Sequence, residues 1–477
     1  MILAGFAINV TTEGDFTQYT WWAAAVLSLI VIVSAVLKYL FFRYQLLDDA
    51  VQVKQGILFK KRLNLKFSRI QNVNIRHPFY FRPLGLVTLK IDGAGSKGEE
   101  VSLSALTQAT ANSIRQTIRI KKEGIDAVQN HQTAELKNQT GVDAENEEAF
   151  YRRTLTDLVI HGLTNNRAWF VLAGLFAALQ YTSISFGDLV RFMQVVVSYY
   201  ISNQNVAFTV VLFTVSVVLA VFLTAFLSVV GSILTYYGFT LFRSDKSMMV
   251  HRGLINKQEF NMQKSRVQSI YIRQDWLDLV LGRANVIYEQ ISHSPNDPNQ
   301  ADSGKRIVVP SARSHEITKL VAEIFPISDV AELSYTPISK RYFYKYSIIW
   351  SVIYLIIAVV IITQSENQRL SLIVAIIWPY HVFLIYMIWK RAGITLIDDI
   401  VIIRRGIIGV DYIIFPAYKI QAVDYVQSLL MKRHELSNLI FHTASRTARI
   451  NYLPSQFVRK IIDFCVYRAE SSSRSWM

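Results

Sequence analysis

Cysteine is almost absent from this chain: Cys465 is the single cysteine among 477 residues, so no disulfide can form within it. Its place in an amphipathic segment predicts a small buried side chain and not a reactive thiol. Catalytic signatures are absent too. The nine histidines form no H-E-x-x-H pair, and no G-x-S-x-G elbow occurs. We therefore expect no metal site, no cofactor and no enzymatic activity.

What the chain has instead is apolar runs. The composition is 52% hydrophobic and 18% charged, with a mean hydropathy of +0.27, which is typical of a chain with both membrane and water-facing parts. A helix needs roughly 20 apolar residues to cross a bilayer, and only helices satisfy their own backbone in lipid. Five runs have about this length: 21–42, 168–186, 206–239, 343–362 and 372–389.

Basic residues are nearly absent from one side of these runs. The segments on that side are 1–20, 187–205 and 363–371, and of the 50 Lys and Arg residues they contain only Arg191 and Arg369. Because Lys and Arg remain on the cytoplasmic side, the rest of the chain outside the spans is predicted to face the cytoplasm. We therefore expect a multi-pass membrane protein whose repeated parts and C-terminus face the cytoplasm.

The first ten residues, MILAGFAINV, are also apolar. Two interpretations fit them equally: part of a sixth span, or a short interfacial segment. The first twenty residues carry no basic residue and no A-x-A site, so they do not have the pattern of a secretory signal.

Three stretches of the chain share one register. Each contains a glycine, in VKQGIL, VHRGLI and IRRGII. A basic residue stands thirteen positions after this glycine, and a glutamine stands two positions after the basic residue. A second glycine stands 29 residues after the first in two copies, where the third copy has Glu435. Such a register indicates one structural unit used three times. Its signature positions are Gly56, Arg69, Gln71 and Gly85; Gly253, Arg266, Gln268 and Gly282; and Gly406, Lys419 and Gln421.

Each copy predicts the same order of elements. Apolar and polar residues alternate on both sides of the first glycine, as in a β-hairpin, and further alternating runs follow. Each copy ends in an amphipathic stretch of helical period, such as residues 455–470. We expect three α+β units, each a small antiparallel barrel or split sheet closed by a C-terminal helix.

This pattern resembles the bacterial pleckstrin-homology (PH) domain membrane proteins of the YdbT type. The resemblance rests on RGLI and RGII, the R-x-Q runs, PLGL at 83–86 and GLTNN at 162–166, and it covers nearly the whole chain. Gln55 and the HELSN segment of the third copy depart from it. The resemblance implies a multi-pass α-helical protein of a bacterial inner membrane that carries three PH-like domains, and it implies fold and location more than activity.

The segments between the copies have their own character. Residues 123–149 are polar and acidic, which predicts a flexible tether, and the amphipathic run 150–163 predicts a helix along the inner membrane face. The expected parts are an N-terminal membrane region (1–42), a first PH-like domain (43–122), a polar linker with a juxtamembrane helix (123–167), a hairpin of spans (168–239), a second PH-like domain (240–326), a second hairpin of spans (343–389) and a third PH-like domain (390–470).

The first copy is the most basic. Residues 38–122 hold 16 Lys and Arg against 5 Asp and Glu, whereas 240–342 hold 14 against 11 and 390–477 hold 13 against 7. A basic surface beside an anionic leaflet gains about 1 kcal/mol per near-surface charge. The alternative is that these side chains are solvated and reflect only the positive-inside rule of membrane topology. The candidate residues for lipid or partner binding are Lys54, Lys60, Lys61, Arg62 and Lys66.

The recurrent basic residue and glutamine have two interpretations. Residues two apart on a strand point the same way, so the pair can bind backbone carbonyls at a corner of the barrel or form a polar site for a peptide. A pair present in every copy favours the structural role. Within the spans, Pro379 predicts a kink, and His381 is favoured as a side chain packed between helices over one lining a transport path.

We therefore expect a membrane-anchored scaffold without enzymatic activity. Its three PH-like domains would dock a protein partner, a second copy or anionic lipid headgroups, and three weak sites on one anchor would raise the effective concentration. Exposed strand edges would also permit β-augmentation. No nucleic-acid partner is expected. The alternative is a transporter or export component whose PH-like domains regulate the spans.

Overall fold

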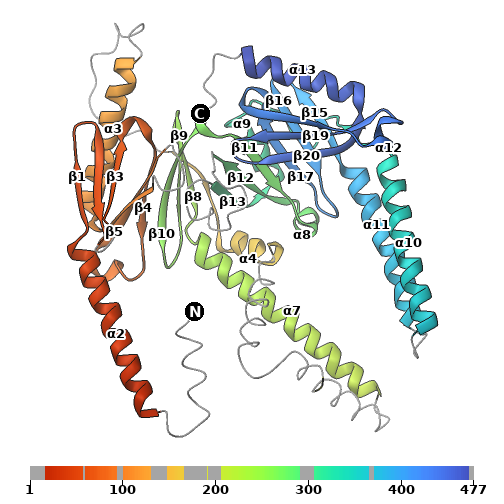
Figure 1. The fold of residues 1–477 in the computed structure, drawn as a ribbon, viewed down its shortest axis with the longest axis horizontal. Helices are drawn as coiled ribbons and strands as arrows, with labels where there is room; N and C mark the ends of the chain where they lie inside the picture. The colour runs from red at the N-terminus through yellow and green to blue at the C-terminus, as the bar shows by residue number, and fades with distance from the viewer. Residues whose placement is uncertain are drawn as a thin grey trace. The chain divides into compact units, whose positions relative to one another are not determined.

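The computed structural model describes two compact units. The first unit contains the first repeat, helix α7 (Val206–Tyr236) and residues 254–257. The second unit contains the other two repeats and the segment that ends at Thr164 (Figure 1). The described residues are 17–56, 60–93, 100–129, 148–165, 191, 206–290, 306–364 and 370–471.

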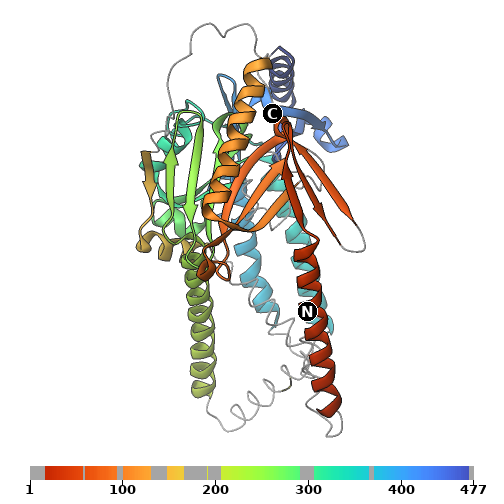
Figure 2. The same cartoon turned by 90° about the vertical axis from the view of Figure 1, so that its left-hand side faces the viewer.

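The first repeat has two layers of three antiparallel strands and a closing helix. The strands pair in the orders β1-β2-β3 and β4-β5-β6, and a short 3-10 turn, η2, leads from β3 to β4. Helix α2 leads directly into β1, and α3, light orange in Figure 2, runs along the strands. The elements are α2 (Thr17–Leu40), β1 (Arg43–Leu46), β2 (Ala50–Gln55), β3 (Lys61–Lys66), η2 (Phe67–Arg69), β4 (Ile70–His77), β5 (Leu86–Gly93), β6 (Glu100–Thr107) and α3 (Gln108–Gln129).

The second repeat follows the same order and gains one strand. β7 pairs with β8, so the sheet of this repeat runs β7-β8-β9-β10, and β11-β12-β13 form the other layer. Helix α4 (Leu155–Thr164) contacts β13 and α8. The remaining elements are β7 (Glu148–Arg152), β8 (Thr240–Arg243), β9 (Ser247–Arg252), β10 (Lys257–Gln263), η4 (Lys264–Arg266), β11 (Ser269–Arg273), α8 (Trp276–Val280), β12 (Arg283–Glu289), β13 (Arg306–Arg313) and α9 (Ser314–Ala322).

The third repeat again gains a strand from the segment before its span. β14 pairs with β15, and the hairpin of α10 and α11 lies between these two strands in the sequence. Its elements are β14 (Thr336–Pro337), α10 (Arg341–Gln364), α11 (Leu370–Arg391), β15 (Gly393–Ile397), β16 (Ile400–Arg405), β17 (Asp411–Pro416), η6 (Ala417–Lys419), β18 (Ile420–Val426), α12 (Leu429–Lys432), β19 (Leu436–Thr443), β20 (Thr447–Pro454) and α13 (Ser455–Ser471).

The second and third repeats are joined by one continuous sheet. β11 of the second repeat pairs antiparallel with β17 of the third, and the sheet runs β13-β12-β11-β17-β16-β15-β14. The register places Ile270 opposite Ile414 and Ile272 opposite Tyr412. Backbone hydrogen bonds and buried isoleucines therefore hold the two repeats together as one body.

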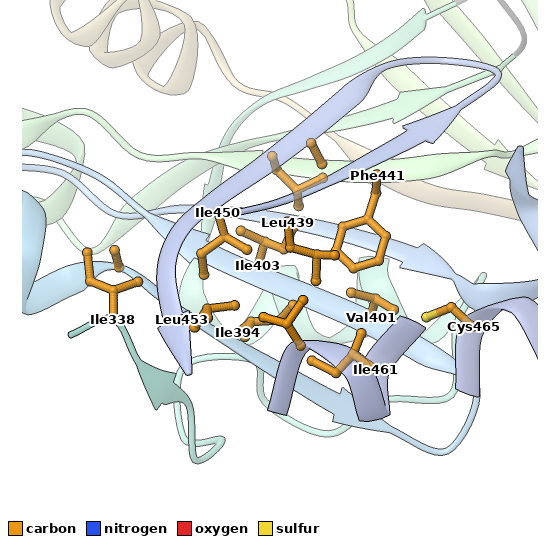
Figure 3. Packing of buried hydrophobic residues seen from close by; sticks show 14 of the residues in the cluster. Ile338, Ile394, Val401, Ile403, Leu439, Phe441, Ile450, Leu453, Ile461 and Cys465 are labelled. Carbon is orange, nitrogen blue, oxygen red and sulfur yellow. The ribbon is translucent and has the colours of Figure 1, made fainter. Parts of the chain in front are cut away.

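The core of the third repeat lies between its two sheets and α13. Val401, Ile403, Leu439 and Phe441 are fully buried there, and Figure 3 shows α13 contributing Ile461 and Cys465 to the same cluster. The alternation of apolar residues along the strands accounts for this core, because every second side chain points inward. Cys465 is buried as predicted, and burial raises the pKa of its thiol to about 12.

The glycines of the repeat take the backbone conformation that glycine favours. φ is +106° at Gly56, between β2 and β3, +107° at Gly253, between β9 and β10, and +155° at Gly406, between β16 and β17. Gly85 and Gly282 have φ of +63° and +62°, and Glu435 adopts +51° at the matching position of the third repeat. The backbone there is unchanged although the residue differs.

The recurrent glutamine lies at a β-bulge. The pairing of β4 with β5 skips from Ile70 to Asn72, and that of β18 with β19 skips from Ile420 to Ala422, so Gln71 and Gln421 are the extra residues. A bulge bends and twists the strand that carries it. In these two repeats the glutamine therefore lies where the chain turns from one layer into the other.

The predicted tether between the first and second repeats is in part regular structure. Helix α3 continues to Gln129, and residues 148–149 begin β7, which pairs with β8. The expectation of a flexible tether over 123–149 is therefore wrong at both ends: residues 123–129 continue α3, and residues 148–149 pair with an existing sheet edge, which outweighs their polar composition. Residues 130–147 lie outside the described ranges.

Within the described ranges, two helices are long and apolar enough to cross a membrane: Thr214–Tyr236 in α7 and Arg341–Thr363 in α10. Helix α2 contains a shorter apolar stretch, Ala25–Ser34, and α11 is helical around Pro379. The predicted span 168–186 lies outside the described residues. A protein with five or six spans therefore stays a prediction.

Candidate functional site

One row of basic residues crosses the first sheet of the first repeat. The register pairs Arg43 of β1 with Lys54 of β2, and Lys54 with Arg62 of β3. All three side chains are exposed. Neighbouring strands lie about 4.8 Å apart, so three positive charges lie within about 10 Å of one another. We call Arg43, Lys54 and Arg62 the basic row.

The basic row lies at the end of the sheet that joins the apolar helix. Arg43 is the first residue of β1, only three residues after α2 ends at Leu40. The next row along the strands is Gln45, Gln52 and Asn64, which is polar and uncharged. The charge on this face is thus concentrated at the end nearest α2.

Like charges directly opposite one another on a sheet are destabilising, so the basic row is a cost to folding. None of the three residues forms an ion pair with a carboxylate among the residues that the structure describes. A site that retains unneutralised positive charge on adjacent strands is suited to binding an anion with several oxygens. Arg and Lys both bind phosphate, Arg in a bidentate manner.

The other two repeats keep the register of this row but not its charge. In the second repeat the same positions are Thr240, His251 and Glu259. In the third they are Gly393, Arg404 and Tyr412, and Arg404 lies over the ring of Tyr335 at 4.5 Å while its Nε donates to the Arg391 carbonyl. The row of three cations is therefore a property of the first repeat alone.

Of the five predicted binding residues, the structure brings Lys54 and Arg62 together and sets Lys66 apart. Lys66 pairs with Ala50 at the other end of β3, about 13 Å along the strand from Arg62. Lys60 is exposed just before β3, and Lys61 takes the register position opposite Gln55. Arg43 was not predicted from the sequence. Extending the alternation of polar and apolar residues from β2 back across the β1–β2 turn would have placed it on the same face.

The basic residue of the third repeat binds backbone carbonyls. Lys419 is 3% exposed, and its Nζ donates to the carbonyls of Ser265 and Val267, each at 2.6 Å. Burial lowers the pKa of Lys419 to about 8. Ser265 lies in the matching 3-10 corner, η4, of the second repeat and Val267 follows it directly, so Lys419 contributes to the junction between repeats. Among its counterparts, Gln268 is buried and Arg266 half-buried, while the side chains of Arg69 and Gln71 lie outside the described set.

A buried carboxylate organises the same junction. Glu289, at the end of β12, is 1% exposed and forms ion pairs with Arg446 at 2.7 Å and Arg306 at 3.1 Å. It also accepts a hydrogen bond from Ser269 Oγ at 2.9 Å. Arg446 comes from the third repeat and lies over the ring of Tyr271 at 4.1 Å.

Tyr271 adds a second polar contact between the repeats. Its hydroxyl donates to Asp411 at 2.7 Å, and burial together with the Asp411 carboxylate raises the pKa of Tyr271 to about 12. The phenol is therefore neutral at every physiological pH, and this donor is always present.

The helical hairpin of α10 and α11 contains one polar group of interest. His381 stacks on Trp350 with ring centroids 4.4 Å apart, and its Nδ1 lies 3.4 Å from the Tyr354 hydroxyl. The histidine thus packs between the two helices, after Pro379 in α11. Over the described ranges, no group of three His, Cys, Asp or Glu side chains is placed to hold a metal ion.

Apolar helices with exposed surfaces and three β-barrel-like repeats define a membrane-associated protein built from PH-like domains. The bacterial PH domain family matches residues 2–122, 168–333 and 348–468, so the chain belongs to this family and carries its domain in three repeats. The third repeat is matched like the others, despite Glu435.

The chain is also similar to the UPF0699 transmembrane protein YdbT of Bacillus subtilis (strain 168). The two are 22% identical over 442 residues, which cover 91% of this chain and 86% of that protein. This confirms the resemblance that the sequence signature indicates. The printed name of the relative specifies a membrane protein and no activity.

Proposed function

We propose that this chain is a membrane-anchored docking protein whose first repeat binds anionic lipid headgroups through the basic row. The observation that carries the proposal is the alignment of Arg43, Lys54 and Arg62 on three adjacent strands, three residues beyond the end of α2. A sheet end so close to an apolar helix meets the leaflet that the helix enters. The predicted excess of basic residues on one side makes that leaflet the cytoplasmic one.

The expected strength follows from the number of charges. A basic residue near an anionic surface contributes about 1 kcal/mol, so the row contributes about 3 kcal/mol. That is on the order of a 100-fold shift between the docked and undocked first repeat, since 1.4 kcal/mol is tenfold. Salt weakens the interaction, because the Debye length is about 8 Å at physiological ionic strength.

The test is hydrogen exchange of the full chain in nanodiscs. Backbone amides of β1, β2 and β3 should be better protected in discs that contain phosphatidylglycerol than in discs of phosphatidylcholine alone. The triple variant Arg43→Gln, Lys54→Gln, Arg62→Gln should lose this difference.

Two controls separate docking from net charge. Lys66→Gln removes a charge from the same strand at its far end, and Arg449→Gln, Arg459→Gln, Lys460→Gln removes three exposed charges from the third repeat. Both should keep the phosphatidylglycerol effect. Equal protection in the two kinds of disc, or an effect that the triple variant retains, would contradict the proposal.

A second candidate function is docking of a second copy through a strand edge, and the pairing of β11 with β17 favours it. That pairing joins two PH-like units edge to edge within one chain. β18 is the third-repeat counterpart of β11, and in the described part of the chain its strand partner is β19 alone. Gln421, Asp424, Tyr425 and Val426 are exposed along it.

The counterpart of β17 in the first repeat is β3, whose strand partner within its sheet is β2. Transferring the register of the internal junction to a β18–β3 contact places Tyr425 opposite Arg62, as Ile272 lies opposite Tyr412. An exposed aromatic ring opposite an exposed guanidinium is a favourable cross-strand pair. Because the two surfaces differ, copies would join head to tail.

Disulfide trapping tests this contact in the full chain with Cys465→Ser. A mixture of the Tyr425→Cys and Arg62→Cys variants should form a crosslinked dimer in membranes, whereas either variant alone should not. A mixture of Tyr425→Cys and Asn64→Cys is the control, because that register is shifted by two residues. Equal crosslinking of both mixtures, or none of either, would rule out the proposed edge contact.

A further inference from the structure

Helix α4 exposes an apolar stripe and buries polar side chains beside Leu158, its one buried leucine. Asp157, His161 and Thr164 are buried, whereas Leu155 is 56% exposed, Val159 36% and Leu163 46%. The three exposed residues follow one another at intervals of four, so they form one stripe along the helix. A helix packed on a soluble domain has the opposite arrangement, with its apolar stripe inward.

Buried ion pairs hold α4 in this orientation. Arg283 of β12 donates to Asp157 at 2.6 Å and to Ser311 Oγ at 3.0 Å. Burial alone would raise the pKa of Asp157, but the hydrogen bonds from Arg283 and Thr154 outweigh it and lower the pKa, so the carboxylate is charged. Just before the helix, Arg153 pairs with Glu316 of α9 at 2.7 Å.

Helix α8 contacts α4 and adds exposed apolar side chains of its own. Trp276 is 58% exposed, Val280 73%, and Leu281 just after the helix 46%. The polar residue of this short helix, Asp278, is again buried: it contacts Asn285 at 3.3 Å, and burial raises its pKa. Large apolar side chains from two neighbouring elements thus face outward together, which marks an interaction site on a folded domain.

The chain itself indicates what covers this surface. The Arg153 amide donates to the carbonyl of Phe239, three residues after the candidate span in α7 ends at Tyr236. At the other end of α4, the next residue, Asn165, accepts a hydrogen bond from Ser228 within that span. Because Phe239 follows the candidate span directly in the chain, the hydrogen bond from Arg153 holds the start of α4 within a few residues of the point where the chain leaves that span.

We propose that the α4–α8 surface, formed by Leu155, Val159, Leu163, Trp276, Val280 and Leu281, inserts into the boundary between headgroups and acyl chains of the bilayer. This goes beyond headgroup binding by the first repeat, because the site lies in the second repeat and its ligand chemistry is apolar. The ion pairs Arg283–Asp157 and Arg153–Glu316 fix the helix so that the second repeat lies against the membrane.

The test places a fluorophore on the surface in the full chain. Val280→Cys and Leu163→Cys, each with Cys465→Ser, are labelled with an environment-sensitive dye and placed in nanodiscs with brominated lipids. Tyr467→Cys is the matched control, because Tyr467 is 65% exposed on α13, the helix at the other end of this unit in Figure 1. Folding is checked by the elution volume of each labelled protein.

The expected result is a blue-shifted emission at positions 163 and 280 and at least fivefold stronger quenching by bromine than at position 467. Water-like emission at both positions would overturn the proposal. So would a blue shift without quenching by brominated lipid, since protein and not lipid would then cover the surface. Neither outcome depends on anionic lipid, so failure here leaves the basic row untouched.

Discussion

Replacing Glu289 by glutamine removes one charge from the junction of the second and third repeats and keeps the shape of the side chain. Glu289 is 1% exposed and is shared by Arg446, Arg306 and Ser269. Breaking a buried ion pair costs about 3–5 kcal/mol, because the remaining charge stays unpaired. The side chains of the two arginines are 15% and 25% exposed, so water recovers part of the loss and we expect about 3 kcal/mol.

The assay is hydrogen exchange of the full chain in nanodiscs. A cost of about 3 kcal/mol corresponds to roughly 100-fold faster exchange of the amides that pair β11 with β17, since 1.4 kcal/mol is tenfold. The amides that pair β15 with β16 should change little. Arg273→Gln is the control: its pair with Asp275 is 3.4 Å long and its side chain is 44% exposed, so we expect less than about fivefold.

Two results would refute this reasoning. The first is β11–β17 exchange in Glu289→Gln at the level of the Arg273→Gln control, which would mean that the strand pairing holds the repeats together without the carboxylate. Alternatively, acceleration spread equally over the third repeat would mean that Glu289 supports the fold of a domain and not the junction.

Three other perturbations test the described geometry. Burial lowers the pKa of Lys419 to about 8, below its usual value of about 10.4, so the folded state binds this proton less tightly than the unfolded chain. The free energy of unfolding should therefore rise between pH 8 and 10, by at most about 3 kcal/mol. In denaturant titrations, Lys419→Met should flatten this rise. Gly409→Ala should speed hydrogen exchange at the β11–β17 junction, because an added Cβ meets the carbonyl of Gln274. Gly282 has open space around it and a φ of +62°, so Gly282→Ala should lower the free energy of unfolding by only about 1 kcal/mol. Cys465 should react with a thiol reagent at pH 8 only after unfolding, because it is fully buried and its pKa is about 12.

The sequence predicted the repeat well because its signals are local. Gly56 and Gly253 stand at hairpin turns whose φ, +106° and +107°, few other residues adopt. Apolar runs likewise predicted α10 and α11 to within a few residues, since a helix that faces lipid needs an unbroken apolar stretch.

What the sequence did not show is how distant segments complete a sheet. β7 begins in a stretch whose polar composition predicts a tether, and β14 has only two residues. Each becomes a strand because the repeat that follows offers an unpaired edge, and this depends on tertiary structure. For α4 the sequence predicted an amphipathic helix along the inner membrane face, but periodicity did not show that Asp157 and His161 are buried against the protein.

The sequence predicted two of the three residues of the basic row. Lys54 and Arg62 stood out by charge, but clustering in the sequence also drew in Lys66, which the register places at the far end of β3, and left out Arg43. Adjacency along a chain is a poor guide to adjacency across a sheet, where residues about ten positions apart lie opposite one another.

The three repeats also share a backbone conformation that their residue types do not reveal. Ala105, Ser311 and Tyr452 have φ of +60°, +47° and +57°, each at a bulge in the last strand before the closing helix. Such a conformation costs a non-glycine residue about 1–3 kcal/mol, so the surrounding fold must impose it. In the second and third repeats an asparagine on the facing strand accepts the hydrogen bond of the strained amide, Asn285 for Ser311 and Asn438 for Tyr452. Alanine, serine and tyrosine share no side-chain chemistry, so what these repeats have in common is a backbone path. That leaves the exposed faces free to diverge, which is how one repeat comes to carry three cations where the others carry none or one.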